Sequence, residues 1–145
     1  MLGHIVSKDG IKIDPSRVSA ILKIDIPRKK KEVQSFIGKV NFLRRFLPNF
    51  AENCKRITCM PRKDNCIKWT VESKQSFSDI KKALTEAPVL VSLDFTKDFL
   101  IFFFASEHTV VGVLLQKNDQ GEEQPIAFYS KVLCDASLKY NIMEK

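Results

Sequence analysis

The sequence is short of the residues that build several common kinds of functional site. Only five glycines occur in 145 residues, and none forms the glycine-rich loop that cradles nucleotide phosphates. The nucleophile pattern G-x-S-x-G and the metalloprotease pattern H-E-x-x-H are also missing, and the two histidines, His4 and His108, lie far apart. These absences exclude nucleotide-fold fingerprints and the most familiar hydrolase motifs.

Cysteine and long apolar runs are equally scarce. The four cysteines include no C-x-x-C pair and have no neighbouring histidine, so a zinc site is not expected. No secretory signal precedes them, which favours free thiols in a reducing compartment. The longest apolar run, Phe99 to Ser106, is too short to cross a bilayer. We therefore expect an intracellular protein, cytoplasmic or nuclear and not secreted, with no membrane partner.

Positive charge is concentrated in the first half of the chain. Residues 1–70 hold 16 Lys and Arg against 6 Asp and Glu, whereas residues 71–145 hold 8 against 11. Such a basic half favours a polyanionic partner, although a lysine-rich surface in water explains the same composition. The 44% of hydrophobic residues, with eleven Phe among them, indicates a folded core.

The pattern of the first half of the chain predicts a hairpin followed by helices. Alternation on either side of a Lys8-Asp9-Gly10 turn predicts a β-hairpin. Asp14-Pro15 predicts the start of a helix that Pro27 ends. Apolar residues at helical spacing then predict one helix from Lys30 to the residue before Pro48, followed by a short helical stretch over 50–57. The apolar stripe of the long helix comprises Val33, Phe36, Ile37, Val40, Leu43 and Leu47.

Basic residues flank that stripe. Lys39, Arg44 and Arg45 lie off it, and such cations attract phosphates without reading sequence. A helix whose charges are simply solvated explains the pattern equally well. Phe42 and Phe46 have the chemistry to stack on bases, but core packing is the commoner role and is what we expect of both.

The second half changes from helical to strand periodicity. Residues 59–68 carry charges and little pattern, which indicates an exposed linker and a domain boundary. Thr70 then predicts the N-cap of a helix that Pro88 ends. Three strands are expected over Phe99–Phe104, Val110–Gln116 and Pro125–Tyr129, with a helix from residue 135 onward. The acidic residues of this half show no cluster of the kind that two-metal hydrolysis requires.

Five stretches, in order, resemble the polymerase polyprotein of gypsy-type LTR retrotransposons, and of the plant type among them. LGHIVSKDGIKIDPSRVSAI at 2–21 is similar to the segment that leaves the reverse transcriptase palm. KKEVQSFIGKVNFLRRFLPNFAE at 30–52 resembles the thumb, with its F-x-G-x-x-N-x-x-R-R-F pattern. IKWTVESKQSFSDIKKALTEAPVL at 67–90 resembles the bridge that follows, and 105–116 with 124–133 resemble RNase H strands. LKYNIMEK at 138–145 is similar to the start of the first RNase H helix.

The resemblance implies an α+β fold, with a small helical thumb preceded by a β-hairpin and followed by a truncated RNase H-like α/β domain of three antiparallel strands. The implied divisions are the end of the palm over 1–14, thumb helices over 15–58, a linker and bridging helix over 59–88, and the N-terminal part of the RNase H-like domain over 89–145.

The resemblance also implies where nucleic acid binds. In the family the thumb helix lies along the template–primer duplex, which is an RNA–DNA hybrid or a DNA duplex. Gly3 and His4 match the region near the primer terminus, and Gly38 would let the backbone approach the nucleic acid closely. The matching thumb positions are Lys30, Lys31, Gly38, Lys39, Asn41, Arg44 and Arg45.

The departures from the family concern catalysis. Phe104 stands where active relatives carry the first metal-binding Asp of RNase H, and a phenyl ring cannot hold a cation. Intact family enzymes use Mg²⁺, but we expect no catalytic residue, metal or cofactor in this fragment. The sequence therefore predicts a piece of an RNA-directed DNA polymerase polyprotein that contributes template–primer binding alongside the rest of the polyprotein. The alternative is a non-functional or domesticated remnant with only a structural role.

Overall fold

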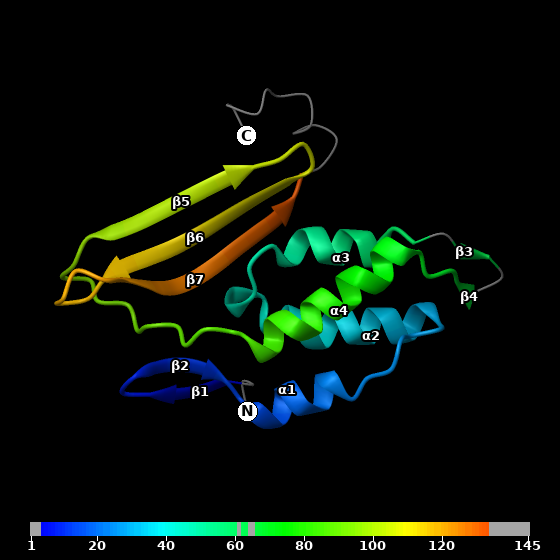
Figure 1. The fold of residues 1–145 in the computed structure, drawn as a ribbon, viewed down its shortest axis with the longest axis horizontal. Coiled ribbons are helices and arrows are strands. Elements are labelled where there is room, and N and C mark those ends of the chain that lie inside the picture. Colours follow the sequence, from blue (N-terminus) through cyan, green and yellow to red (C-terminus); the bar gives the residue numbers. More distant parts are fainter. Residues whose placement is uncertain (1–3, 61, 64–65, 134–145) are drawn as a thin grey trace.

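The computed structural model describes residues 4–60, 62–63 and 66–133, and within them the fold is α+β, as predicted (Figure 1). A β-hairpin and four α-helices form one part, and a three-stranded antiparallel sheet lies beside them. No helix in these residues is both long enough and apolar enough to span a membrane. The helix expected from residue 135 onward falls outside the described residues.

The predicted hairpin is present and is tied to a distant part of the chain. β1 (His4–Ser7) pairs antiparallel with β2 (Gly10–Ile13). Ile11 and Leu90 exchange backbone hydrogen bonds of 2.6 and 2.8 Å. Gly10 has a φ of +130°, and a Cβ there would lie 2.4 Å from the Leu90 carbonyl oxygen. Glycine is therefore required where the hairpin meets this later segment.

The first helix, α1 (Pro15–Leu22), begins as predicted but ends earlier. Asp14 caps it, since its carboxylate accepts a 2.9 Å hydrogen bond from the Ser16 N–H. The prediction that the helix continues to Pro27 is wrong. Its last carbonyl, that of Leu22, accepts a 2.9 Å hydrogen bond from Lys81 Nζ, so a residue remote in sequence satisfies the helix end.

The single helix predicted over 30–47 is two elements. α2 (Lys30–Asn41) is followed by the short 3₁₀ helix η1 (Arg44–Phe46). A continuous α-helix turns by about 100° per residue and would carry Phe46 away from the buried stripe. The tighter turn instead brings two successive residues, Phe46 and Leu47, into the core. The prediction of one continuous helix is wrong for this reason.

Two further helices, α3 (Phe50–Thr58) and α4 (Val71–Thr85), occur where the sequence predicts them and pack against each other. The Thr70 hydroxyl caps α4 by accepting a 3.1 Å hydrogen bond from the Ser73 N–H. The buried face of α4 carries the predicted apolar residues, and Phe77 packs on Phe36 of α2 with ring centres 4.7 Å apart. The predicted apolar residues of α4 are Phe77, Ile80 and Leu84.

The stretch over 59–68 is more ordered than the exposed linker that the sequence predicts. β3 (Arg62–Lys63) pairs antiparallel with β4 (Cys66–Ile67), and Met60 is buried. A single hydrophobic cluster extends from the hairpin through the four helices to Leu90, and Phe128 of the sheet packs against it. The helices before and after this stretch thus share one core, and the domain boundaries drawn from the sequence stay predictions.

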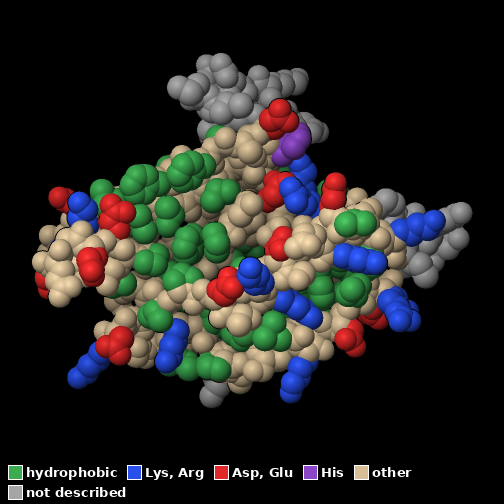
Figure 2. Space-filling view, viewed as in Figure 1, with side chains coloured by type: hydrophobic (Ala, Val, Ile, Leu, Met, Phe, Trp, Pro, Cys, Tyr) green, Lys and Arg blue, Asp and Glu red, His purple; other side chains and the backbone are tan. Residues whose placement is uncertain are grey.

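The three predicted strands form one sheet in the order β5 (Phe99–Ala105), β6 (Thr109–Lys117) and β7 (Glu123–Val132). Hydrophobic side chains gather over this sheet on the face shown in Figure 2, whereas Lys and Arg lie mainly around the hairpin and helices. The sheet side chains that remain exposed include Phe99, Ile101, Phe102, Phe103, Phe104 and Tyr129.

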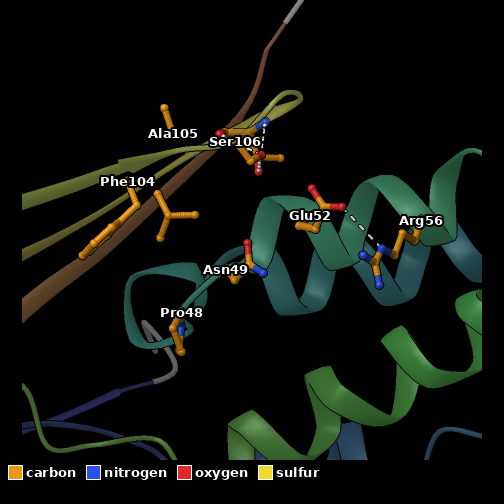
Figure 3. Close-up of a pocket in the computed structure, with 9 residues that line it drawn as sticks. Pro48, Asn49, Glu52, Arg56, Phe104, Ala105 and Ser106 are labelled. Carbon is orange, nitrogen blue, oxygen red and sulfur yellow. Dashed lines mark hydrogen bonds and ion pairs between the residues drawn. The ribbon is translucent and has the colours of Figure 1, made fainter. Parts of the chain in front are cut away.

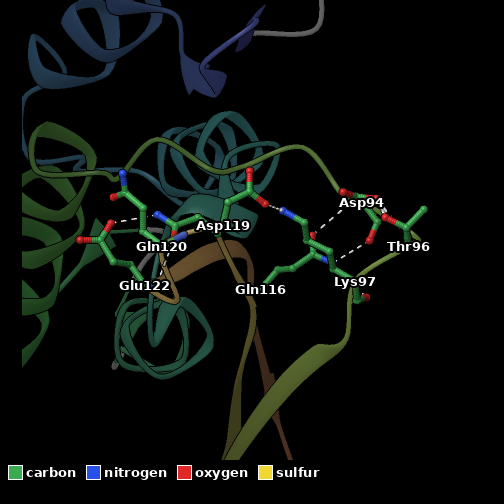
Figure 4. A network of polar contacts seen from close by, with 8 residues as sticks. Asp94, Thr96, Lys97, Gln116, Asp119, Gln120 and Glu122 are labelled. Carbon is green, nitrogen blue, oxygen red and sulfur yellow. Dashed lines mark hydrogen bonds and ion pairs between the residues drawn. The ribbon is translucent and has the colours of Figure 1, made fainter.

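A buried glutamine fixes the loop that leads into β5 (Figure 4). The Gln116 side chain accepts a 3.1 Å hydrogen bond from the Asp94 N–H and donates to the carbonyls of Asp94 and Lys97, at 2.6 and 3.2 Å. Lys97 also bonds Asp119 across the neighbouring turn at 2.6 Å. These contacts satisfy a buried amide and hold the loop on the end of the sheet.

The sheet meets the helices through β7 and α3. Ser130 of β7 accepts a 2.9 Å hydrogen bond from the Ala51 N–H in the first turn of α3. The N-cap residue of that helix, Asn49, has a φ of +55° and makes no capping bond with its own side chain. A serine from another part of the fold therefore supplies the missing cap and joins the two parts.

Candidate nucleic-acid interface

Most of the predicted thumb residues lie on the exposed side of α2, and Arg44 and Arg45 follow on η1. The opposite face of α2 is buried through Val33, Phe36 and Val40, at the spacing of an amphipathic helix. Residues four apart on a helix project from the same side, so Gly38 and Phe42 line up on the side that faces solvent. The helix thus presents an open surface flanked by cations.

All five predicted cations of this face are available to a partner. Lys30, Lys31, Lys39 and Arg44 are exposed, and Arg45 is half-buried. Among the described residues none of the five forms an ion pair, so no internal acid neutralises them. Unpaired cations on one surface are what a phosphate backbone recognises.

Arg44 and Arg45 lie on η1 instead of on the long helix that the sequence predicts. The Arg45 guanidinium carbon lies 5.8 Å from the centre of the Phe46 ring. The His4 ring of the hairpin lies 6.5 Å from the same ring, centre to centre. The structure therefore brings the predicted primer-region residue His4 beside the basic turn. Gly3, its predicted companion, falls outside the described residues.

Gly38 and Phe42 give the face its shape. A Cβ added at Gly38 would meet nothing within 4 Å, so the helix is bare at that point. Phe42 was expected in the core, but 74% of it is exposed, while Phe46 is buried as expected. Asn41, also exposed, stands beside Phe42. The expectation for Phe42 was wrong because Phe42 lies four residues after Gly38 and shares the solvent-facing side of α2, while Leu43 and Phe46 fill the core.

Sequence reasoning missed Phe42 and Gln34 as members of this face. Gln34, Gly38 and Phe42 are spaced by four residues, so they project from one side of α2. That spacing was visible in the sequence. It would have separated Phe42 from the stripe that contains Val40 and Leu43.

Phe104, predicted to replace a metal-binding carboxylate, is the last residue but one of β5 and is 66% exposed. It lines a cleft in which the one carboxylate is Glu52, and Glu52 pairs with Arg56 at 3.4 Å. Among the described residues no group of three His, Cys, Asp or Glu is placed to hold a metal ion. The residues around the end of β5 do not fit a divalent cation.

The cysteines with described side chains are not arranged as a site. Cys54 lies partly buried on α3, and burial raises the pKa of its thiol to about 12. Cys59 is exposed at the end of the same helix. A thiol that stays protonated at neutral pH is a poor nucleophile and a poor metal ligand, so Cys54 acts as a packing residue.

Known proteins of similar sequence match nearly the whole chain. The chain is 36% identical to the Retrovirus-related Pol polyprotein from transposon 297 of Drosophila melanogaster over 145 residues. It is 32% identical to the Transposon Tf2-3 polyprotein of Schizosaccharomyces pombe over 144 residues. Each match covers 99% of this chain but only 13% and 11% of those relatives, respectively.

Solved structures of foamy viral protease-reverse transcriptase have the same fold. One, in complex with double-stranded DNA, matches with a TM-score of 0.80 and 33% identity over 100% of this chain and 25% of its own. Another, in complex with an RNA/DNA hybrid, matches with a TM-score of 0.80 and 32% identity over 99% and 20%. The model of the RNase H-like domain found in reverse transcriptase matches residues 69–145, from α4 onward. The chain belongs to this family of RNase H-like domains of reverse transcriptases and is homologous to part of the retrotransposon pol polyproteins.

Proposed function

We propose that this chain binds the template–primer duplex within a retrotransposon reverse transcriptase and takes no part in catalysis itself. The observation that carries the proposal is the exposed face of α2, where unpaired cations surround a bare glycine and an exposed aromatic ring. The foamy viral structures with the same fold are complexes with double-stranded DNA and with an RNA/DNA hybrid, which supports a duplex as the ligand.

The two kinds of residue on this face have different tasks. The cations, Lys39, Arg44 and Arg45 among them, attract phosphates, and each phosphate contact releases counterions and makes binding depend on salt. Phe42 offers an apolar surface to sugars and base edges in a shallow groove, and that contact releases no counterions. Gly38 leaves room for the nucleic acid backbone to approach the helix.

A hydrolytic role is not supported. Phe104 occupies the place that we assign to the first metal-binding Asp, and its surroundings lack a carboxylate cluster among the described residues. The other reading, a remnant with only a structural role, is not favoured. The helix caps and the core account for the fold of the described part of the chain, but a structural role leaves the exposed cations of α2, which form no ion pair there, without a purpose.

The test compares two triple variants in a fluorescence anisotropy assay with a labelled RNA–DNA hybrid. The first removes three cations of the proposed face, through Lys39→Ala, Arg44→Ala and Arg45→Ala together. The second removes the same charge elsewhere, through substitutions to Ala at Lys74, Lys82 and Lys117, which are exposed on α4 and β6.

The first triple variant is expected to bind at least about tenfold more weakly than the second, because it loses up to three phosphate contacts. Equal loss in both variants would show that only net charge matters, and the proposed interface would be wrong. Phe42→Ala provides an independent check. We expect it to weaken binding without changing the dependence of affinity on salt.

A further inference from the structure

A cleft of about 460 Å³ lies between the start of α3 and the end of β5, away from the face of α2 (Figure 3). Asn49 and Glu52 point toward it from the helical side, Arg56 lies along the helix beside Glu52, and Phe104 lines the wall that the sheet forms. Nothing in the proposed duplex interface uses these residues.

The cleft is held open by contacts beside it. Ser130 bonds the first turn of α3 at 2.9 Å and so fixes the distance between the helix and the sheet. The turn after β5 is fixed by a 2.8 Å hydrogen bond between the Ser106 and Thr109 hydroxyls. A cleft whose two walls are anchored in this way is preformed, which lowers the cost of filling it.

The charge of the cleft argues against a phosphate or a metal ion as its ligand. Glu52 and Arg56 pair at 3.4 Å, so the lining carries no net charge. The remaining polar groups are neutral hydroxyls and the Asn49 amide, for which the described structure offers no hydrogen-bond partner. The cleft thus combines an exposed aromatic ring, 66% accessible at Phe104, with neutral donors and acceptors.

We infer that this cleft binds the base of an unpaired nucleotide, with Phe104 stacking on the base and Asn49 bonding its edge. This inference rests on the proposed nucleic-acid function and extends it from duplex to single strand. A base has an apolar face and an edge with both donors and acceptors, which is the chemistry of this lining. In this proposal Phe104, at the end of β5, has a role in binding.

The experiment uses the 145-residue chain and a duplex with a single-stranded template overhang that contains 2-aminopurine, whose fluorescence reports stacking. Wild type is expected to change the fluorescence of the overhang and to bind it more tightly than the blunt duplex. Phe104→Ala is expected to abolish the fluorescence change and to weaken overhang binding by about fivefold or more, the range of one lost base–aromatic stack. Binding of the blunt duplex is expected to stay unchanged.

Two variants separate stacking from general effects of substitution. Phe104→Leu keeps apolar bulk but lacks a ring, so it is expected to behave like Phe104→Ala; full rescue by leucine would overturn the stacking role. Phe95→Ala removes an exposed ring outside the cleft and is expected to have no effect. Asn49→Gly removes the amide while tolerating the positive φ, and is expected to weaken overhang binding.

The outcomes distinguish this inference from the proposed function. If Phe104→Ala leaves overhang fluorescence and affinity as in wild type, the cleft does not bind a base, whatever the face of α2 does. If the triple variant at Lys39, Arg44 and Arg45 leaves blunt-duplex affinity unchanged, the proposed duplex interface fails, and the Phe104 result still reports on the cleft alone.

Discussion

Replacement of Gly38 by alanine separates the stability of α2 from its function. Gly38 lies inside the helix, and a Cβ there would meet nothing within 4 Å. Alanine restricts the unfolded chain more than glycine does and suits a helix better, so Gly38→Ala is expected to raise the free energy of unfolding by about 0.5 to 1 kcal/mol. Urea unfolding followed by circular dichroism measures this change.

The same methyl group would project from the proposed duplex face. If nucleic acid approaches the helix at Gly38, the variant binds a duplex more weakly although its fold is more stable. Ser78→Ala is a matched control, because Ser78 is exposed on α4, away from that face. It is expected to stabilise the fold with no change in duplex affinity. A Gly38→Ala protein that is more stable and binds as tightly as wild type would refute close approach at this residue.

Three further predictions concern the fold. Ser130→Ala removes the hydroxyl that caps α3 and should lower the free energy of unfolding by about 1 kcal/mol in a urea titration; an unchanged midpoint would contradict the cap. Gly10→Ala forces a Cβ against the Leu90 carbonyl at positive φ, and should cost more than about 1 kcal/mol by the same assay. Cys54 should react with iodoacetamide far more slowly than Cys59, as mass spectrometry of the labelled peptides would show, because burial keeps its thiol protonated.

Local signals predicted most of the elements. Asp14 and Thr70 cap the helices that they were expected to cap, and the change to alternating periodicity after Pro88 predicted three strands that the structure contains. These signals succeed because capping and periodicity depend on residues close together in the sequence. The resemblance to retrotransposon polymerases was likewise carried by continuous motifs.

Two errors arose where distant residues decide the local structure. Lys81 satisfies the end of α1, and the burial of Phe46 and Leu47 together requires the 3₁₀ turn that ends the long helix early. No pattern within either segment reports these contacts. Phe42 was misplaced for a different reason, since its four-residue spacing from Gly38, which the sequence itself shows, already puts it on the exposed side of α2.

The candidate site was predictable in part. The cations of α2 were found from charge and spacing, and the structure shows them exposed. The proximity of His4 to Arg45, which meet at the Phe46 ring, depends on how the hairpin folds back onto η1. The cleft beside Phe104 depends on how the sheet docks against α3. Neither arrangement is encoded in a local motif.

The dependence of duplex affinity on salt tests the central claim most directly. If the cations of α2 and η1 contact phosphates, a plot of log affinity against log salt concentration is steep for the wild-type chain. Its slope falls by about 0.9 for each contact removed in the Lys39, Arg44 and Arg45 triple variant, while the matched triple variant on α4 and β6 keeps the wild-type slope. An affinity for the wild-type chain that is the same at low and high salt would contradict the account.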